Sequence, residues 1–370
     1  MTSETEVVAA WEEPSDWQQP RPTLHVRGEF AYVTEPATQE LHVVDLTQDV
    51  ELAMELGYTS LAVRSMFGTN NGIAGQVLVG FGTDEQKQRF LPPTFRGEMI
   101  WCQLFSEPGA GSDLAGLACR AERDGDEWVI NGQKIFTSLA GYADYVWLAA
   151  RTDPDAPKHK GITIFAVPTD TPGFSYTKIP TMVNASTYQT FYDDVRVGRD
   201  AVIGEVNRGW DLIVNQLNYE RVGLAPPGIT EGPYEAVLEW ARDTPHPDGG
   251  RYLDREWVQT NLAEVRAGIE YLTLLNWKMA ALEAAGEAVN PADASSVKVF
   301  GTEFALRAMQ LLTEIVGPTA ILEPDSPAAV LESRLSRAAQ GGLILTFGGG
   351  TNEVQRDIIG MVALGLPRSR

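Results

Sequence analysis

The segment WCQLFSEPGAGSDLAGLACRAERDGDEWVINGQKIFTS, Trp101 to Ser138, marks the point where helical periodicity gives way to strand periodicity. It begins with an apolar run, breaks into a loop of small residues between Glu107 and Asp113, and then returns to alternating strand patterns. A loop of Gly, Ala and Ser lets backbone N–H groups approach a flat or anionic ligand, because no Cβ stands in the way. The alternative is an ordinary turn between strands.

Composition limits the class of protein. The chain has 370 residues, which is too long for one simple core, so several packed subdomains are expected. Its formal net charge of −21 argues against nucleic acid or an anionic membrane as a partner, because binding to either rests on Lys and Arg. Two cysteines, Cys102 and Cys119, and scattered histidines give no disulfide framework and no metal spacing. No membrane-length apolar run and no secretory signal pattern are present, which predicts a cytoplasmic protein without a metal.

Periodicity changes along the chain. Residues 1–44 show no helical period and are interpreted as extended or partly ordered. Apolar spacing predicts a helix from Leu46 to Gly57, and Thr83 followed by acidic residues predicts the N-cap of another. Between Glu98 and Val197 the period becomes two, with turn residues between the runs. That pattern predicts a small, mostly antiparallel β-domain.

Beyond Asn207 the pattern becomes helical again. Helices, then a β-domain, then a four-helix-like bundle is a segregated α+β arrangement. We therefore predict an irregular and helical N-terminal domain at 1–97, a β-domain at 98–207 and a helical bundle at 208–370. The predicted helical segments of the bundle are Trp210 to Arg242, Arg255 to Ala285, Pro291 to Val316, Pro327 to Thr346 and Asn352 to Leu364.

Three separated motifs resemble those of the acyl-CoA dehydrogenase family of flavoenzymes. They are EPGAGSD, then NGQKIFTS, and near the C-terminus GGTNEVQRDII, and the resemblance covers roughly Leu52 to Arg368. It implies the three-domain fold of the family, with a shortened N-terminal helical domain here. It also implies α,β-dehydrogenation of an acyl-CoA thioester with FAD as hydride acceptor, because no common side chain accepts hydride.

The catalytic base implied by the resemblance is a Glu that relatives carry at one of two places. The position before the C-terminal Gly-Thr is Gly349 here, which has no carboxylate but keeps the backbone N–H that would hold the thioester oxygen. The other position, on the first long helix of the bundle, is Glu220, followed by Arg221 as a substrate contact. The alternative for Glu220 is a solvated charge pair with Arg221. The flanking apolar residues favour the dry environment that suits a base: Val214, Leu217, Val222, Leu224 and Ala225.

The resemblance also implies a set of FAD contacts. Ser112 is expected to contact the acyl-CoA as well, and Phe136 to flank the flavin ring. The alternative for Phe105 and Phe136 is that they pack in the core. The alternative for Thr137 and Ser138 is that they are ordinary polar residues at the end of a strand. The FAD-binding positions carried over from the family are Gln103, Leu104, Phe105, Ser106, Gly111, Ser112, Phe136, Thr137, Ser138, Thr351 and Glu353.

The chain departs from the family at the half-site that each subunit offers to its neighbour's FAD. A Pro/Gly loop with Pro245 and Pro247 replaces an Arg-x-x-Phe-Gly stretch, and Glu314 and Pro318 stand in a Gln-x-x-Gly-Gly stretch. A helix cannot continue undisturbed through such prolines, and an acidic residue repels a pyrophosphate.

These departures favour a heteromer in which a second dehydrogenase-like subunit completes the FAD site, as an α2β2 heterotetramer. The chain looks like the heteromeric acyl-CoA dehydrogenases of actinobacterial steroid catabolism, which implies a steroid side-chain acyl-CoA substrate and an electron-transfer flavoprotein or similar acceptor. Two alternatives stay open: a flavin monooxygenase of the same fold, and a non-catalytic partner subunit.

Overall fold

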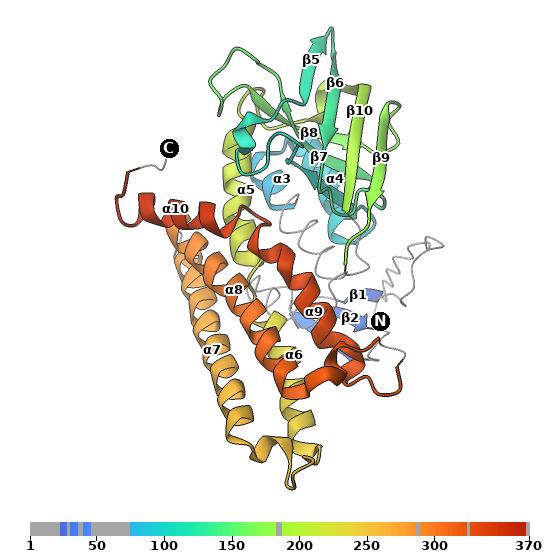
Figure 1. Cartoon of the computed structure of the whole chain (residues 1–370). Coiled ribbons are helices and arrows are strands. Elements are labelled where there is room, and N and C mark those ends of the chain that lie inside the picture. The colour runs from blue at the N-terminus through green and yellow to red at the C-terminus, as the bar shows by residue number, and fades with distance from the viewer. Residues whose placement is uncertain are drawn as a thin grey trace, which may run out of the picture. The chain divides into compact units, whose positions relative to one another are not determined.

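The computed structural model describes residues 23–27, 30–35, 40–45, 75–182, 187–285, 289–323 and 326–367. The chain divides into two compact units, which meet in sequence between Glu220 and Arg221. We call the first the β unit, because it contains the large sheet, and the second the helical unit (Figure 1). No described helix has the length and apolarity needed to cross a membrane.

The N-terminal region contains three short strands, β1 (Thr23–Arg27), β2 (Phe30–Glu35) and β3 (Glu40–Asp45), ordered β1-β2-β3 in one sheet. The extended conformation expected for residues 1–44 is found in the described ranges 23–27, 30–35 and 40–45, as strands, and the other residues of that segment lie outside the described ones. The helix predicted from Leu46 to Gly57 lies outside the described residues.

Two helices precede the main sheet, α3 (Gln76–Phe81) and α4 (Asp84–Phe95). The predicted N-cap at Thr83 is confirmed. Its hydroxyl accepts a hydrogen bond from the backbone N–H of Gln86 at 3.2 Å, and the Gln86 side chain accepts one from the Thr83 N–H at 3.0 Å. This reciprocal pair satisfies two of the amides that a helix start leaves without partners.

The β unit contains an eight-stranded sheet of order β11-β8-β7-β5-β6-β10-β9, with β4 paired to β7. The sheet is mostly antiparallel, as predicted, but β4 and β5 both run parallel to β7. The strands are β4 (Trp101–Leu104), β5 (Arg120–Asp124), β6 (Glu127–Lys134), β7 (Tyr145–Arg151), β8 (Ile162–Pro168), β9 (Phe174–Ile179), β10 (Thr187–Gly198) and β11 (Val202–Ile203).

The near-continuous apolar runs of β7 and β8 reflect burial on both faces. Val146 and Leu148 of β7 belong to one buried cluster, whereas Trp147 and Ala149 belong to another. Because successive strand residues point to opposite faces, both faces of these strands must be covered. Burial also raises the pKa of the Cys119 thiol to about 11, so this cysteine is an inert core residue.

The predicted helical segment from Trp210 to Arg242 is wrong in one respect, because it is two helices. They are α5 (Gly209–Gly223) and α6 (Gly228–Asp243), separated by a short break that contains Pro226 and Pro227. Proline has no N–H for the helical ladder and clashes with the preceding turn, so the chain turns here. Both prolines are visible in the sequence and are the signal for this break.

The helical unit continues with α7 (Glu256–Ala284), α8 (Pro291–Val316), α9 (Arg334–Gly342) and α10 (Asn352–Val362). Of the predicted bounds, those of α8 are confirmed at both ends, while α9 is shorter than the predicted 327–346. Helix α8 contacts α6, α7, α9 and α10, so the core forms around it (Figure 1). Short 3₁₀ turns lie at Leu114–Gly116, Arg199–Ala201, Tyr252–Asp254, Gly317–Ile321, Leu331–Ser333 and Leu343–Thr346.

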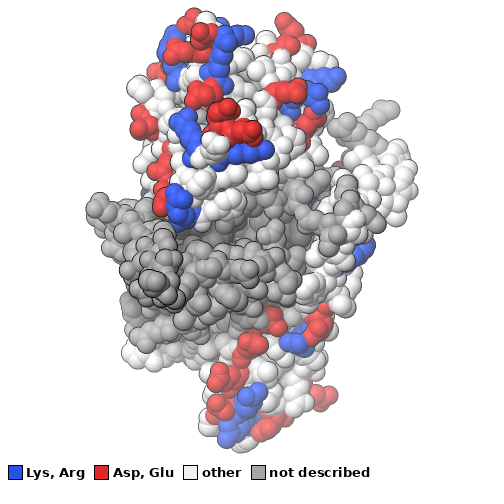
Figure 2. Space-filling view, turned by 180° about the vertical axis from the view of Figure 1, so that it is seen from behind, with Lys and Arg blue, Asp and Glu red and all other residues white. Residues whose placement is uncertain are grey.

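Surface charges of both signs are interleaved on the face drawn in Figure 2, where blue and red atoms lie side by side. The ion pairs of the β unit follow this pattern: Arg196 lies 3.0 Å from Asp124 and 3.0 Å from Glu127. Exposed pairs of this kind contribute little to stability.

Candidate active site

Two loops of the β unit carry the first two motifs, and a buried ion pair joins them. The ammonium of Lys134 is fully buried and donates to Glu107 Oε1 at 2.8 Å and to the Phe105 carbonyl at 3.1 Å. The Glu107 carboxylate also accepts the backbone N–H groups of Ala118 at 2.7 Å and Cys119 at 2.9 Å. Such a pair is tolerated inside a protein only when further hydrogen bonds satisfy both charges, and here they do.

Glu107 and Lys134 were not among the predicted site residues, although both lie inside the quoted motifs. A second link joins the same loops, because the Ile135 N–H donates to the Ser106 carbonyl at 2.9 Å. The signal for the pair in the sequence is Lys134, a single lysine within a strand pattern in which apolar residues alternate. The structure thus brings the two motifs together through residues that were not proposed as ligands.

The small-residue loop, Glu107 to Asp113, is folded as a tight turn and is open on its outer side. Glu107 and Ala110 exchange backbone hydrogen bonds of 2.9 and 3.1 Å. A Cβ added at Gly109 or Gly111 would meet no atom within 4 Å, so the absence of a side chain is not needed for packing within the chain. Ser112 is exposed beside them. The small residues therefore fit a role in admitting a ligand close to the backbone.

The second loop, Ile135 to Ser138, holds an aromatic residue in an unusual conformation. Phe136 has a φ of 60° and is 68% exposed. An aromatic side chain in the left-handed region is strained, by about 1–2 kcal/mol, and this one gains no burial in return. The backbone of the next residue is fixed, since Thr137 and Tyr188 exchange N–H to carbonyl bonds of 3.0 and 3.1 Å. Core packing, the alternative for Phe136, does not fit this exposure.

Thr137 adds a second feature that fits a ligand site. Its side chain is buried, yet among the described residues its hydroxyl has no hydrogen-bond partner. Buried polar atoms are nearly always paired, so this hydroxyl calls for an external group. An exposed aromatic, an unsatisfied hydroxyl and an open small-residue loop in one unit fit a flat, polar cofactor such as a flavin.

The strand that precedes the small-residue loop offers fewer groups than predicted. The side chains of Leu104 and Phe105 are buried, at 1% and 6% exposure, so core packing applies to both. They can offer only their backbone to a ligand, because their side chains are directed into the core. Gln103 and Ser106 are half-buried, and Ser138 is exposed.

Helix α5 is anchored to the sheet of the β unit at its middle. The indole N–H of Trp147 donates to Gln216 Oε1 at 2.9 Å, and both side chains are buried. Gly209 begins the helix where a Cβ would come within 2.9 Å of the Ile162 carbonyl, so only glycine allows this close approach. Leu212 belongs to the buried cluster of this face. The helix is thereby fixed in rotation as well as in position.

Glu220 lies one helical turn after Gln216 and therefore on the same face of α5. Its Oε2 atom is buried, and the residue as a whole is half-buried. Arg221 is 8% exposed, with its Nε buried. A solvated charge pair, the alternative for these residues, does not fit this burial.

The helical unit contains the third motif as a loop, Gly348 to Gly350, which we call the glycine loop. Gly349 and Gly350 have φ values of 65° and 97°, which favour glycine. Within the described residues the Gly349 N–H has no hydrogen-bond acceptor. Thr351 is the N-cap of α10, because its hydroxyl accepts the Val354 N–H at 3.3 Å. Glu353 is exposed in the first turn.

Both departures from the family pattern lie in the helical unit. Helix α6 ends at Asp243, and the following loop folds back on itself with a bridge between Pro245 and Arg251. The Glu314 carboxylate accepts a hydrogen bond from Asn261 at 3.2 Å, and α8 ends two residues later. The loop after α6 does contain arginines, but Arg251 donates to the Arg242 carbonyl at 2.6 Å and Arg255 lies 3.0 Å from His246 Nδ1, so both contact this segment itself. Among the described residues, no group of acidic, His and Cys side chains could hold a metal ion.

Comparisons with known proteins match the chain throughout. Three family models cover it: the acyl-CoA dehydrogenase N-terminal domain at residues 30–98, the middle domain at 102–195 and the C-terminal domain at 207–364. The acyl-CoA dehydrogenase FadE26 of Mycobacterium tuberculosis is 52% identical over 308 residues, which are 82% of this chain and 77% of that protein. The chain belongs to the acyl-CoA dehydrogenase family. Members of this family are FAD-dependent oxidoreductases.

Other acyl-CoA dehydrogenases give the same result. FadE29 of M. tuberculosis is 46% identical, with 80% of this chain and 75% of that protein aligned. Among solved structures, the ChsE4-ChsE5 complex from M. tuberculosis has a TM-score of 0.79 and 49% identity, covering 86% of this chain and 82% of that one. The Tcur3481-Tcur3483 steroid acyl-CoA dehydrogenase has a TM-score of 0.79 and 44% identity, covering 86% and 81%. The predicted family and fold are confirmed.

The structure distributes the predicted site residues of this acyl-CoA dehydrogenase over three places. The FAD-contact residues from Gln103 to Ser138 gather in the β unit. Glu220 and Arg221 lie near the end of α5, and Gly349, Thr351 and Glu353 lie around the glycine loop. Their roles toward FAD and substrate stay predictions.

Proposed function

We propose that this protein catalyses the FAD-dependent α,β-dehydrogenation of an acyl-CoA thioester, and that the substrate is a steroid side-chain acyl-CoA. Membership of the family supports the reaction, and the similarity to an enzyme named as a steroid acyl-CoA dehydrogenase supports the substrate class. The observation that carries the proposal is the buried carboxylate oxygen of Glu220, on a helix whose rotation is fixed by Gln216 and Trp147.

In this proposal Glu220 takes the α-proton of the thioester. The Gly349 N–H donates to the thioester oxygen, which stabilises the negative charge that develops there as the proton leaves. Ser112 and Arg221 contact the acyl-CoA. FAD, when bound, accepts hydride from the β-carbon. The residues proposed to hold FAD are Gln103, Leu104, Phe105, Ser106, Gly111, Ser112, Phe136, Thr137, Ser138, Thr351 and Glu353.

The base is tested by Glu220→Gln, which keeps the shape of the side chain and removes the carboxylate. We expect turnover to fall by at least about a thousand-fold, while bound FAD and the melting temperature stay unchanged. Glu239→Gln, an exposed acid on α6, is the matched control and should leave activity intact. The measurement is anaerobic bleaching of the flavin band by a panel of straight-chain and steroid acyl-CoAs.

Survival of activity in Glu220→Gln would contradict the proposed base. It would favour the alternative that the loss of a carboxylate at Gly349 suggests, a partner subunit that does not catalyse the reaction itself. A flavin that no acyl-CoA reduces would instead contradict the proposed reaction.

We further propose that a second dehydrogenase-like subunit completes the FAD site, in an α2β2 heterotetramer, and that an electron-transfer flavoprotein or similar protein reoxidises the flavin. The prolines of the loop after α6 and the acidic Glu314 support this, because neither suits the binding of a pyrophosphate. Two of the similar structures are named as two-component proteins.

The heteromer is tested by comparing the chain expressed alone with the chain co-expressed with a genomic neighbour of the same family. The chain alone should purify with little FAD, and the co-purified complex with nearly full FAD. Full flavin occupancy in the purified homomer would overturn the proposal.

A further inference from the structure

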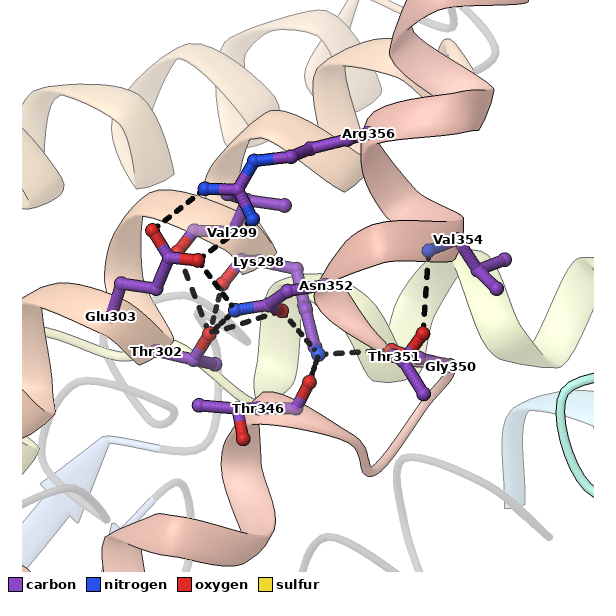
Figure 3. Close-up of polar contacts among 10 residues, drawn as sticks. All are labelled: Lys298, Val299, Thr302, Glu303, Thr346, Gly350, Thr351, Asn352, Val354 and Arg356. Carbon is purple, nitrogen blue, oxygen red and sulfur yellow. Dashed lines mark hydrogen bonds and ion pairs between the residues drawn. The ribbon is translucent and has the colours of Figure 1, made fainter. Parts of the chain in front are cut away.

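A fully buried lysine lies against the glycine loop. Lys298 is on α8, and its ammonium donates to the carbonyls of Thr346 at 3.1 Å and Gly350 at 2.9 Å, and to Asn352 Oδ1 at 2.7 Å (Figure 3). These three acceptors come from both sides of the glycine loop. The ammonium therefore joins the two ends of the loop to the central helix of the unit.

The surrounding network keeps those acceptors in place. Asn352 donates through Nδ2 to Thr302 at 3.1 Å and to Glu303 at 3.2 Å, and its oxygen, which also lies 3.4 Å from the Thr302 hydroxyl, accepts from the ammonium. Glu303 in turn receives two bonds of 2.8 Å from Arg356 of α10 (Figure 3). This ion pair lowers the pKa of Glu303, with the Arg356 hydrogen bond as the largest cause. The orientation of Asn352 is thus fixed by charge at both of its ends.

A second side chain holds the neighbouring peptide. Gln355 Nε2 donates to the Gly349 carbonyl at 3.2 Å, and its Oε1 accepts the Ser295 hydroxyl at 2.7 Å. The peptides that follow Gly349 are therefore restrained through their carbonyls, at Gly349 by Gln355 and at Gly350 by Lys298. Because Lys298 also holds the Thr346 carbonyl before the loop, Gly349 lies between two restrained points of the backbone.

Burial of an ammonium requires an explanation, because its desolvation costs several kcal/mol before any hydrogen bond is counted. An apolar residue of the same volume would fill the position at lower cost. A loop of three glycines, however, loses more conformational entropy on ordering than any other tripeptide. A cation on its carbonyls offsets that loss and also strengthens the amides as donors, because hydrogen-bonded peptides polarise one another.

We propose that Lys298 is a positioning residue for the reaction: it holds the glycine loop so that the Gly349 amide is presented to the thioester oxygen. This inference rests on the proposed function for the role of that amide. The restraint on the loop follows from the contacts of Lys298 alone.

The restraint is tested by Lys298→Met in the full-length chain, with Lys278→Met as the control. Lys278 is an exposed lysine paired with Asp293 at 2.9 Å, outside the site. Hydrogen–deuterium exchange of peptides spanning 343–355 should be at least about ten-fold faster in Lys298→Met, because the loop carbonyls lose their donor. Peptides from β7 and β8 should be unchanged, and the control should match the wild type throughout.

The catalytic consequence is tested in the complex with the co-purified partner, using the acyl-CoA that the wild type oxidises fastest. A mispositioned amide should lower kcat by about 10- to 100-fold, with KM changed less than about three-fold and FAD content retained. Should the Met variant fail to fold, Lys298→Gln keeps a donor and should show intermediate values of both exchange and kcat.

Unchanged exchange in 343–355 would overturn the proposal, as would a loss of kcat that only follows a loss of folded protein or FAD. The proposed function fails separately, if the wild type oxidises no acyl-CoA while the exchange result still shows the restraint by Lys298.

Discussion

Glu107 and Lys134 are 27 residues apart and form the most buried ion pair among the described residues. Their contribution is to hold two loops in one place, through four hydrogen bonds that involve the backbone or each other. Buried pairs of this kind are poor sources of net stability but are costly to break, because the remaining charge keeps its desolvation penalty.

Lys134→Met should therefore destabilise the β unit by about 3–5 kcal/mol, since the Glu107 carboxylate is left in the core without its cation. Urea unfolding followed by tryptophan fluorescence measures this, because Trp101 and Trp147 are buried in the same unit. Arg196→Met removes an exposed ion pair and should cost less than about 1 kcal/mol. Equal effects of the two substitutions would contradict the structural role given to Lys134.

Substitution of Phe136 distinguishes a role in ligand contact from a role in core packing. Because its side chain is 68% exposed, Phe136→Ala should change the free energy of unfolding by less than about 0.5 kcal/mol. We expect the same change to weaken FAD binding at least about ten-fold, measured by flavin fluorescence on titration of the complex. Loss of stability with unchanged FAD affinity would show that the ring is a packing residue after all.

Among the elements, α7 packs against α8 at Gly268. A Cβ at Gly268 would come within 2.0 Å of the Phe304 ring on α8, which is a buried residue. By contrast, a Cβ at Gly360 of α10 would make an ordinary contact of 3.5 Å with Leu366. Gly268 is therefore required for close packing of the helices, whereas Gly360 lies at a helical position that alanine could occupy.

Gly268→Ala should destabilise the helical unit by about 1–3 kcal/mol, because the Phe304 ring must leave its position. Gly360→Ala should instead stabilise it by up to about 1 kcal/mol, because alanine loses less backbone entropy in a helix. Thermal unfolding followed by circular dichroism distinguishes the two signs. Stabilisation by both substitutions would show that α7 and α8 can separate at no cost.

At the scale of the whole molecule, the proposed association with an unlike subunit bears on how an anionic ligand is bound. The surface charge is interleaved on the face seen in Figure 2, and the net charge is −21. A polyanionic ligand such as acyl-CoA therefore depends on local contacts rather than on attraction by the protein as a whole. In the proposed heteromer, part of those contacts to FAD comes from the partner subunit.

Ligand linkage should make this dependence measurable. A ligand that binds only the folded state at a hundred times its Kd stabilises that state by about 2.7 kcal/mol. FAD alone should therefore shift the melting temperature of the isolated chain by less than about 1 °C, and FAD with the co-purified partner by about 3 °C or more. A full shift with FAD alone would contradict the shared site.

Several features of the fold could be predicted from the sequence because their causes are local. Asn290 caps α8 by accepting the Ala292 N–H at 2.8 Å, with Pro291 in the first turn, and Thr83 and Thr351 cap their helices by similar contacts. The period of two between Glu98 and Val197 predicted the β-domain, and the three motifs indicated the family. Each of these signals lies within a few residues of the structure it determines.

Only the tertiary structure determined which atoms form hydrogen bonds with the buried polar groups. The contacts of Lys298 with the glycine loop span about fifty residues, and the bond between Trp147 and Gln216 spans 69. Helical periodicity predicts which face of a helix a lysine occupies. The hydrogen-bond acceptors that offset the burial of its charge come from segments that only packing brings close to it. The sequence therefore determined where the motifs and helices begin, while packing of distant segments determined which side chains hold the loops in place.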